Sequence, residues 1–139
     1  MDVALKPYFR RKYLLSKAEK YFYKILRQIV DPHTVFAKVR LADLVEADER
    51  HRLRLANFRR ICSKHVDFVI CDAALCPIIA VELDDSSHQR ADRRSRDRDV
   101  DRILEIASLP IARFRVQQTY DDGEIQSQLL EKLSRQRLR

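Results

Sequence analysis

Three acidic residues stand at positions where they could meet on one face of a β-hairpin. The segments 65–71 (HVDFVIC) and 78–83 (IIAVEL) are typical of two strands joined by a turn. In a symmetric hairpin Asp67 lies opposite Glu82, with Cβ atoms about 5 Å apart. Asp84 follows Glu82 by two positions and therefore shares its face. The hairpin thus predicts three carboxylates on one patch of a sheet.

Carboxylates this close repel one another by about 1 kcal/mol or more per pair, even with water-like screening. A shared proton or a bound cation relieves such repulsion, and Mg²⁺ or Mn²⁺ is held by carboxylate oxygens. We therefore expect a divalent-metal site on this hairpin. The alternative is that Asp84 and Asp85 only cap the following helix, while Glu82 faces solvent.

His88 stands four residues after Asp84, where the next helix is expected to start. An imidazole there could bind the metal, orient a water molecule, or act as a general base or acid. A histidine at a helix start is more often a polar surface residue. Its spacing to the carboxylates is what makes His88 a candidate.

The other face of the hairpin is apolar and must be covered by further elements. Its expected core residues are Val66, Phe68, Ile70, Val81 and Leu83.

Helices are expected on either side of these strands. Ser16 to Glu19 reads as a capping box that opens a helix, and Asp31-Pro32 ends it. This helix has an apolar face with i, i+3, i+4, i+7 spacing, formed by Phe22, Ile25, Leu26 and Ile29.

The remaining segments complete an alternation of helices and strands. We expect a strand at 34–41, a helix or partly ordered excursion at 47–63, a helix at about 89–108, a strand at 110–116, and a C-terminal helix from 124 to about 133 with a frayed tail. This order predicts an α/β domain in which a four-stranded mixed sheet is flanked by helices. We expect a single domain over 1–139, with its core at about 13–133.

Composition limits the function classes. The net charge of +7 permits binding to nucleic acid or to an anionic membrane surface. A single glycine argues against a Gly-rich phosphate loop. Three cysteines without a C-x-x-C pair exclude a zinc knuckle and a disulfide framework, so we expect reduced thiols in or near the core of a cytoplasmic protein. Neither a membrane-spanning run nor a signal peptide is expected.

The segment VDFVICDAALCPIIAVELDDSSH resembles the restriction-endonuclease-like superfamily, the PD-(D/E)xK nucleases. It is especially similar to the variant D-F…(I/V)-E-x-D-x-x-x-H of relatives of the very-short-patch-repair endonuclease, and to a bacterial family with a signature like E-L-D-D-x-S-H. A downstream D-x-x-x-D-x-x-L stretch ending in LPIARFRV is similar too, and the resemblance covers about 16–116. It implies a core of helix, three-stranded meander, helix and strand.

The resemblance also implies roles for individual residues. Asp67 and Glu82 match the metal-binding acids, and Asp84 stands where the usual motif has its lysine. His88 matches the histidine used by the repair-endonuclease-like subset. Glu19 matches an acid on the first helix that can reach a second metal or its waters, although the capping box alone explains it.

The missing E-x-K lysine removes the usual water-orienting cation. Lys38 on the preceding strand or His88 could take over that role, or catalysis is lost. Lys38 also fits an ordinary lysine at a strand edge. A run of arginines follows His88 and is dense enough to hold phosphates, although a solvated charge run needs no function; it comprises Arg90, Arg93, Arg94, Arg96 and Arg98.

The leading hypothesis is a metal-dependent nuclease that hydrolyses phosphodiester bonds in nucleic acid, with DNA as the expected substrate and Mg²⁺ or Mn²⁺ as cofactor. The alternative is a catalytically inactive nuclease-fold module that binds nucleic acid or a protein partner. A membrane-surface domain would rest on charge alone, and no membrane partner is expected.

Overall fold

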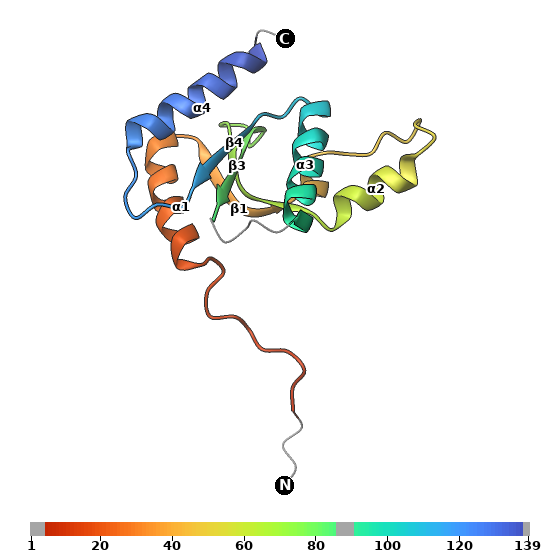
Figure 1. The fold of residues 1–139 in the computed structure, drawn as a ribbon, viewed down its shortest axis with the longest axis horizontal. Helices are drawn as coiled ribbons and strands as arrows, with labels where there is room; N and C mark the ends of the chain where they lie inside the picture. Colours follow the sequence, from red (N-terminus) through yellow and green to blue (C-terminus); the bar gives the residue numbers. More distant parts are fainter. Residues whose placement is uncertain (1–4, 86–90, 138–139) are drawn as a thin grey trace.

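The computed structural model describes the backbone of residues 5–85 and 91–137, and the side chains of residues 5–85 and 98–135. Four α-helices, one short 3₁₀ helix and four strands are seen in this part of the chain (Figure 1). In order they are α1 (Lys17–Val30), β1 (Thr34–Arg40), η1 (Leu41–Asp43), α2 (Arg54–Cys62), β2 (His65–Cys71), β3 (Pro77–Asp84), α3 (Ala91–Ile106), β4 (Ile111–Arg115) and α4 (Asp122–Arg137).

The strands form one mixed sheet in the order β1-β2-β3-β4. β1, β2 and β3 are antiparallel neighbours, whereas β3 and β4 run parallel. A parallel pair cannot be joined by a tight turn, and α3 supplies the crossover that it needs. The predicted α/β class, a four-stranded mixed sheet flanked by helices, is confirmed.

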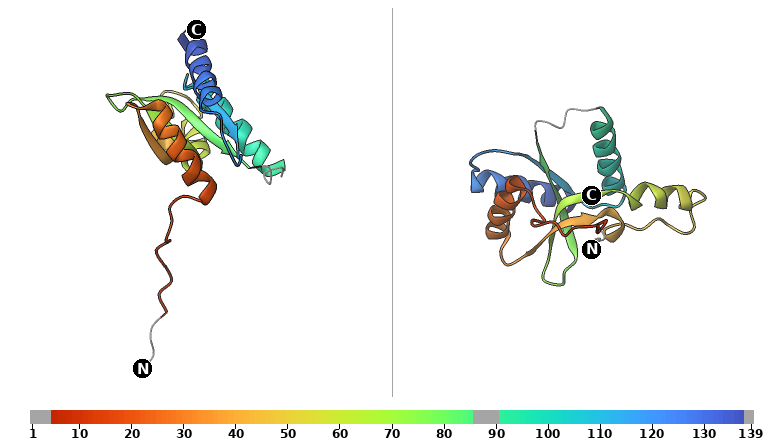
Figure 2. Two further views of the ribbon diagram at one scale, coloured as in Figure 1. Left: turned by 90° about the vertical axis from the view of Figure 1, so that its left-hand side faces the viewer. Right: turned by 90° about the horizontal axis from the view of Figure 1, so that it is seen from below.

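The sheet is covered on both faces by helices (Figures 1 and 2). One face packs against α1 and α4 through a first cluster that includes Phe22, Phe68, Val81 and Leu129. The other face packs against α2 and α3 through a second cluster that includes Ile61, Val69, Ala80 and Leu104.

The helix α1 begins at the predicted capping box. The Ser16 hydroxyl accepts from the Glu19 amide at 3.2 Å, and the Glu19 carboxylate accepts from the Ser16 amide at 2.8 Å. Both bonds satisfy amides that a helix start otherwise leaves unpaired. The helix ends at Val30, with Asp31 as its C-cap, as the Asp-Pro pair predicts.

Two helices differ in length from their predicted spans. α2 covers only residues 54–62, because its start has no side-chain cap and Ile61 is its one buried residue. α4 continues to Arg137, so most of the tail predicted to be frayed is helical. Its buried Ile125 and Leu129 hold the helix against the sheet. Within the described residues, no helix is long and apolar enough to cross a membrane.

Along the strand pair β1–β2, the regular alternation of side chains between the two faces of the sheet is interrupted at Lys38. Ala37 and Phe68 are partners at the first cluster, whereas the next pair, Val39 and Val66, packs at the second cluster. Lys38 lies between these pairs with φ of 53°, in the left-handed region that interrupts regular alternation. The prediction that Val66 shares a face with Phe68 is therefore wrong, because strict alternation does not continue through Asp67.

The cysteines are only partly in the core. Cys71 is buried in the second cluster, and burial raises the pKa of its thiol. Cys62 and Cys76 are exposed, which differs from the expectation that all three thiols lie in or near the core.

Candidate active site

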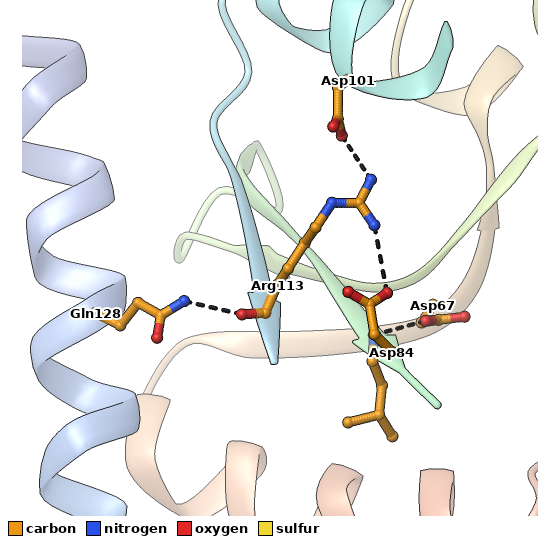
Figure 3. A network of polar contacts seen from close by, with 6 residues as sticks. Asp67, Asp84, Asp101, Arg113 and Gln128 are labelled. Carbon is orange, nitrogen blue, oxygen red and sulfur yellow. Dashed lines mark hydrogen bonds and ion pairs between the residues drawn. The ribbon is translucent and has the colours of Figure 1, made fainter. Parts of the chain in front are cut away.

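Asp67 reaches across the hairpin to β3. Phe68 pairs with Val81, so one further antiparallel step brings Asp67 beside Glu82, in the predicted register. The backbone pairing stops there, and Oδ2 of Asp67 accepts a hydrogen bond from the Leu83 amide at 2.8 Å (Figure 3). The half-buried carboxylate thereby takes the place of a strand carbonyl and lies against the segment of β3 that carries the other two acids.

Glu82 and Asp84 lie on the side of the sheet that faces α3. Their neighbours Val81 and Leu83 belong to the first cluster, and side chains alternate along a strand. Both acids are half-buried. Glu82 is also the register partner of Arg113 on β4. The structure thus holds the Asp67 carboxylate at the β3 backbone, at the residue between Glu82 and Asp84.

Arg113 is the main feature of this site that sequence reasoning did not find. Its Nη1 donates to Oδ1 of Asp84 at 3.4 Å, and its Nη2 donates to Oδ1 of Asp101 at 2.6 Å. The side chain is only 26% exposed. Its own carbonyl accepts from Nε2 of Gln128 at 2.9 Å. One residue of β4 thereby links β3, α3 and α4 (Figure 3).

A sequence signal for Arg113 was present in the segment IARFR. Ala112 and Phe114 face the first cluster, so alternation places Arg113 on the side of Glu82 and Asp84. The partner Asp101 could not be identified in the same way. The observed pair crosses from α3 to β4, a contact between two elements that local spacing does not reveal.

The two further candidate residues, Glu19 and Lys38, lie on α1 and β1. The Glu19 carboxylate is engaged in the capping box of α1, a helix that covers the opposite face of the sheet from α3. Lys38 is exposed on the edge strand β1, at the register position across from Asp67. Among the described side chains no ion pair joins Lys38 to Asp67.

The histidine and most of the arginine run cannot be placed. His88 and Arg90 lie outside the described residues. Arg93, Arg94 and Arg96 belong to the backbone of α3, but their side chains are outside the description. Arg98 is exposed on the same helix.

The described acids are of the right chemical type for a hard divalent cation. Mg²⁺ and Mn²⁺ take oxygen ligands, and Asp67, Glu82 and Asp84 present carboxylates from adjacent strands. Over residues 5–85 and 98–135, no group of three or more His, Cys, Asp and Glu side chains is arranged to hold a metal. Arg113 supplies positive charge to Asp84 instead.

Residues 11–133 match a family described as protein of unknown function (DUF2726). The chain belongs to this family. The DUF2726 region contains all four strands, the helices α1 to α3 and the first part of α4, so every candidate acid lies within it. No curated protein and no solved structure matches the chain.

The double ion pair of Arg113 predicts that this residue contributes to stability. We expect Arg113→Met to lower the free energy of unfolding by about 1–2 kcal/mol, between values for exposed and buried ion pairs. Urea unfolding measures the loss. In a double-mutant cycle with Asp101→Asn, a coupling energy near zero would contradict the ion pair between α3 and β4.

Proposed function

We propose that this chain is a metal-dependent nuclease that hydrolyses phosphodiester bonds in nucleic acid, with DNA as the preferred substrate. The observation that carries the proposal is the hydrogen bond from the Leu83 amide to Asp67, because it holds that carboxylate beside Glu82 and Asp84. The mixed sheet with a helix crossover between β3 and β4 agrees with a restriction-endonuclease-like core.

In the proposed mechanism Asp67 and Glu82 would hold Mg²⁺ or Mn²⁺, and Asp84 would assist directly or through water. The bound ion would supply charge stabilisation at the scissile phosphate and a lowered pKa for the attacking water. The role proposed for His88 is that it would orient or deprotonate that water, or protonate the leaving oxygen. Lys38 is the other side chain available for orienting the water in place of the missing lysine.

Substrate binding is assigned to the arginines of α3. Arg98 is exposed on this helix, and Asp101 on the same helix pairs with Arg113 on β4. That ion pair ties α3 to the sheet beside the acids, so phosphates held along the helix would lie close to them. Such a substrate occurs in the cytoplasm, where we expect the protein to act.

One observation favours a second candidate function, a nuclease-fold module that binds nucleic acid or a protein without cleaving. Asp67 and Asp84 already have protein partners, the Leu83 amide and the Arg113 guanidinium. With the E-x-K lysine absent, both carboxylates then act as structural groups that join strands and helices.

Nicking of a supercoiled plasmid tests the proposed function. We expect the native chain to nick DNA with Mg²⁺ or Mn²⁺ and to stop when EDTA is added. Glu82→Gln should abolish nicking, whereas Glu131→Gln, which removes an exposed acid on α4, should leave it unchanged. Salt-dependent DNA binding without cleavage under either metal would overturn the nuclease and support the binding module.

A further inference from the structure

The segment before α1 carries large side chains that the body of the protein does not cover. We call residues 5–15 the N-terminal arm. Tyr8, Phe9 and Tyr13 are 85%, 86% and 64% exposed, and Leu5 and Leu14 are exposed as well. The arm has no helix or strand and runs away from the sheet (Figures 1 and 2). Rings of this size bury 150–250 Å² each when they are covered, so their exposure marks a contact surface.

The charge of the arm restricts what could cover it. Residues 5–15 contain four basic side chains, Lys6, Arg10, Arg11 and Lys12, and no acidic one. The ammonium group of Lys12 lies 5.4 Å from the centre of the Tyr13 ring, so a cation already lies near a ring of this arm. A partner must therefore offer negative charge together with flat apolar surface.

We propose that the N-terminal arm binds single-stranded nucleic acid, with its rings stacked on unpaired bases and its cations on the phosphates. Interleaved aromatic and basic side chains are the recognition chemistry of single strands. The bases of a duplex are already stacked, so they have no free faces for three rings. A membrane surface is favoured by helices that separate apolar and basic faces, and the described arm contains no helix.

The position of the arm connects it with the candidate active site. The arm leaves the body at the start of α1, at the same end of the molecule at which β3 ends (Figures 1 and 2). Asp84 is the last residue of β3. A strand held by the arm would thus approach the carboxylate end of the sheet. This inference rests on the proposed function for its substrate class, and it names an unpaired segment as the preferred part of that substrate.

Binding of fluorescent oligonucleotides in EDTA tests the arm without any cleavage. The full chain is compared with a ring variant, Tyr8→Ser with Phe9→Ser and Tyr13→Ser, and with a charge variant, Arg10→Gln with Arg11→Gln and Lys12→Gln. We expect the ring variant to bind a thymidine 20-mer at least about 20-fold more weakly and to bind a duplex almost as well as the native chain does. For the charge variant, the slope of the logarithm of the binding constant against the logarithm of the salt concentration should be smaller in magnitude by about two.

Leu130→Ser is the matched control, because it removes an exposed apolar side chain from α4 and should leave binding unchanged. Equal binding of the 20-mer by the native chain and the ring variant would overturn the proposal. Binding of the native chain to phosphatidylglycerol vesicles, lost in the ring variant while oligonucleotide binding persists, would assign the arm to a membrane instead. Because EDTA prevents metal-dependent cleavage, a chain that never nicks DNA could still confirm the arm.

Discussion

Asp67→Asn is expected to lower the rate of plasmid nicking by at least about 100-fold while the fold is retained. Loss of a group that only supports a metal ligand already costs 10- to 100-fold in affinity or activity, and loss of a ligand's charge should cost more. Asparagine keeps an oxygen that can accept from the Leu83 amide, so the bond of 2.8 Å has a replacement. The free energy of unfolding should therefore change by less than about 1 kcal/mol.

Asp67→Ala separates the two roles of this residue. It removes the charge and also leaves the half-buried Leu83 amide without its acceptor, which costs about 1–3 kcal/mol. Nicking rates and urea unfolding of the native chain and the two variants are measured side by side. Nicking by Asp67→Asn at the native rate would rule out this carboxylate as a metal ligand, whatever the stability of the alanine variant.

Phe22→Ala is expected to lower the free energy of unfolding by about 3–5 kcal/mol, the largest stability effect that we predict. Phe22 is completely buried on α1. Its ring centre lies 5.8 Å from that of Phe68, 5.4 Å from Phe114 and 5.2 Å from Tyr120. The variant opens a cavity between α1 and the sheet that its neighbours cannot fill completely.

A loss of that size is a large part of the 5–15 kcal/mol that holds an ordinary domain folded. Thermal unfolding should shift by roughly 10–20 °C. Phe58→Ala is the matched control, because this ring on α2 is 49% exposed and its removal should cost less than about 1 kcal/mol. Similar melting temperatures for the two variants would contradict the packing of α1 on the sheet.

Much of the fold could be predicted because its signals are local. The capping box spans only the four residues from Ser16 to Glu19, and both of its hydrogen bonds are present. Away from the turn the hairpin has the predicted register, with Phe68 paired to Val81. Next to the turn the register shifts between Ile70 and Cys71, so the turn is not symmetric. The span of α2 could not be predicted, because its charged sequence lacks a cap and a regular apolar face.

The residues of the candidate site also fall into two groups, those that local sequence signals identify and those whose contacts depend on the tertiary structure. Asp67 and Glu82 could be identified because two adjacent strands hold them in register. Asp84 was identified as an acid, but its partner Arg113 is 29 residues away on a strand that pairs only after a helix has crossed the sheet. His88 remains a prediction, since it lies outside the described residues.

By itself, the sequence determined the order of the strands and helices and which acids share the hairpin, because alternation and capping act over a few residues. Only the tertiary structure decided that Arg113 lies between Asp84 and Asp101, because that contact depends on the parallel pairing of β3 with β4 and on the packing of α3. The tertiary structure also decided which face of the sheet the side chains on either side of Lys38 and Asp67 occupy. The left-handed backbone of Lys38 interrupts the alternation of side chains, which a sequence pattern assumes to be unbroken.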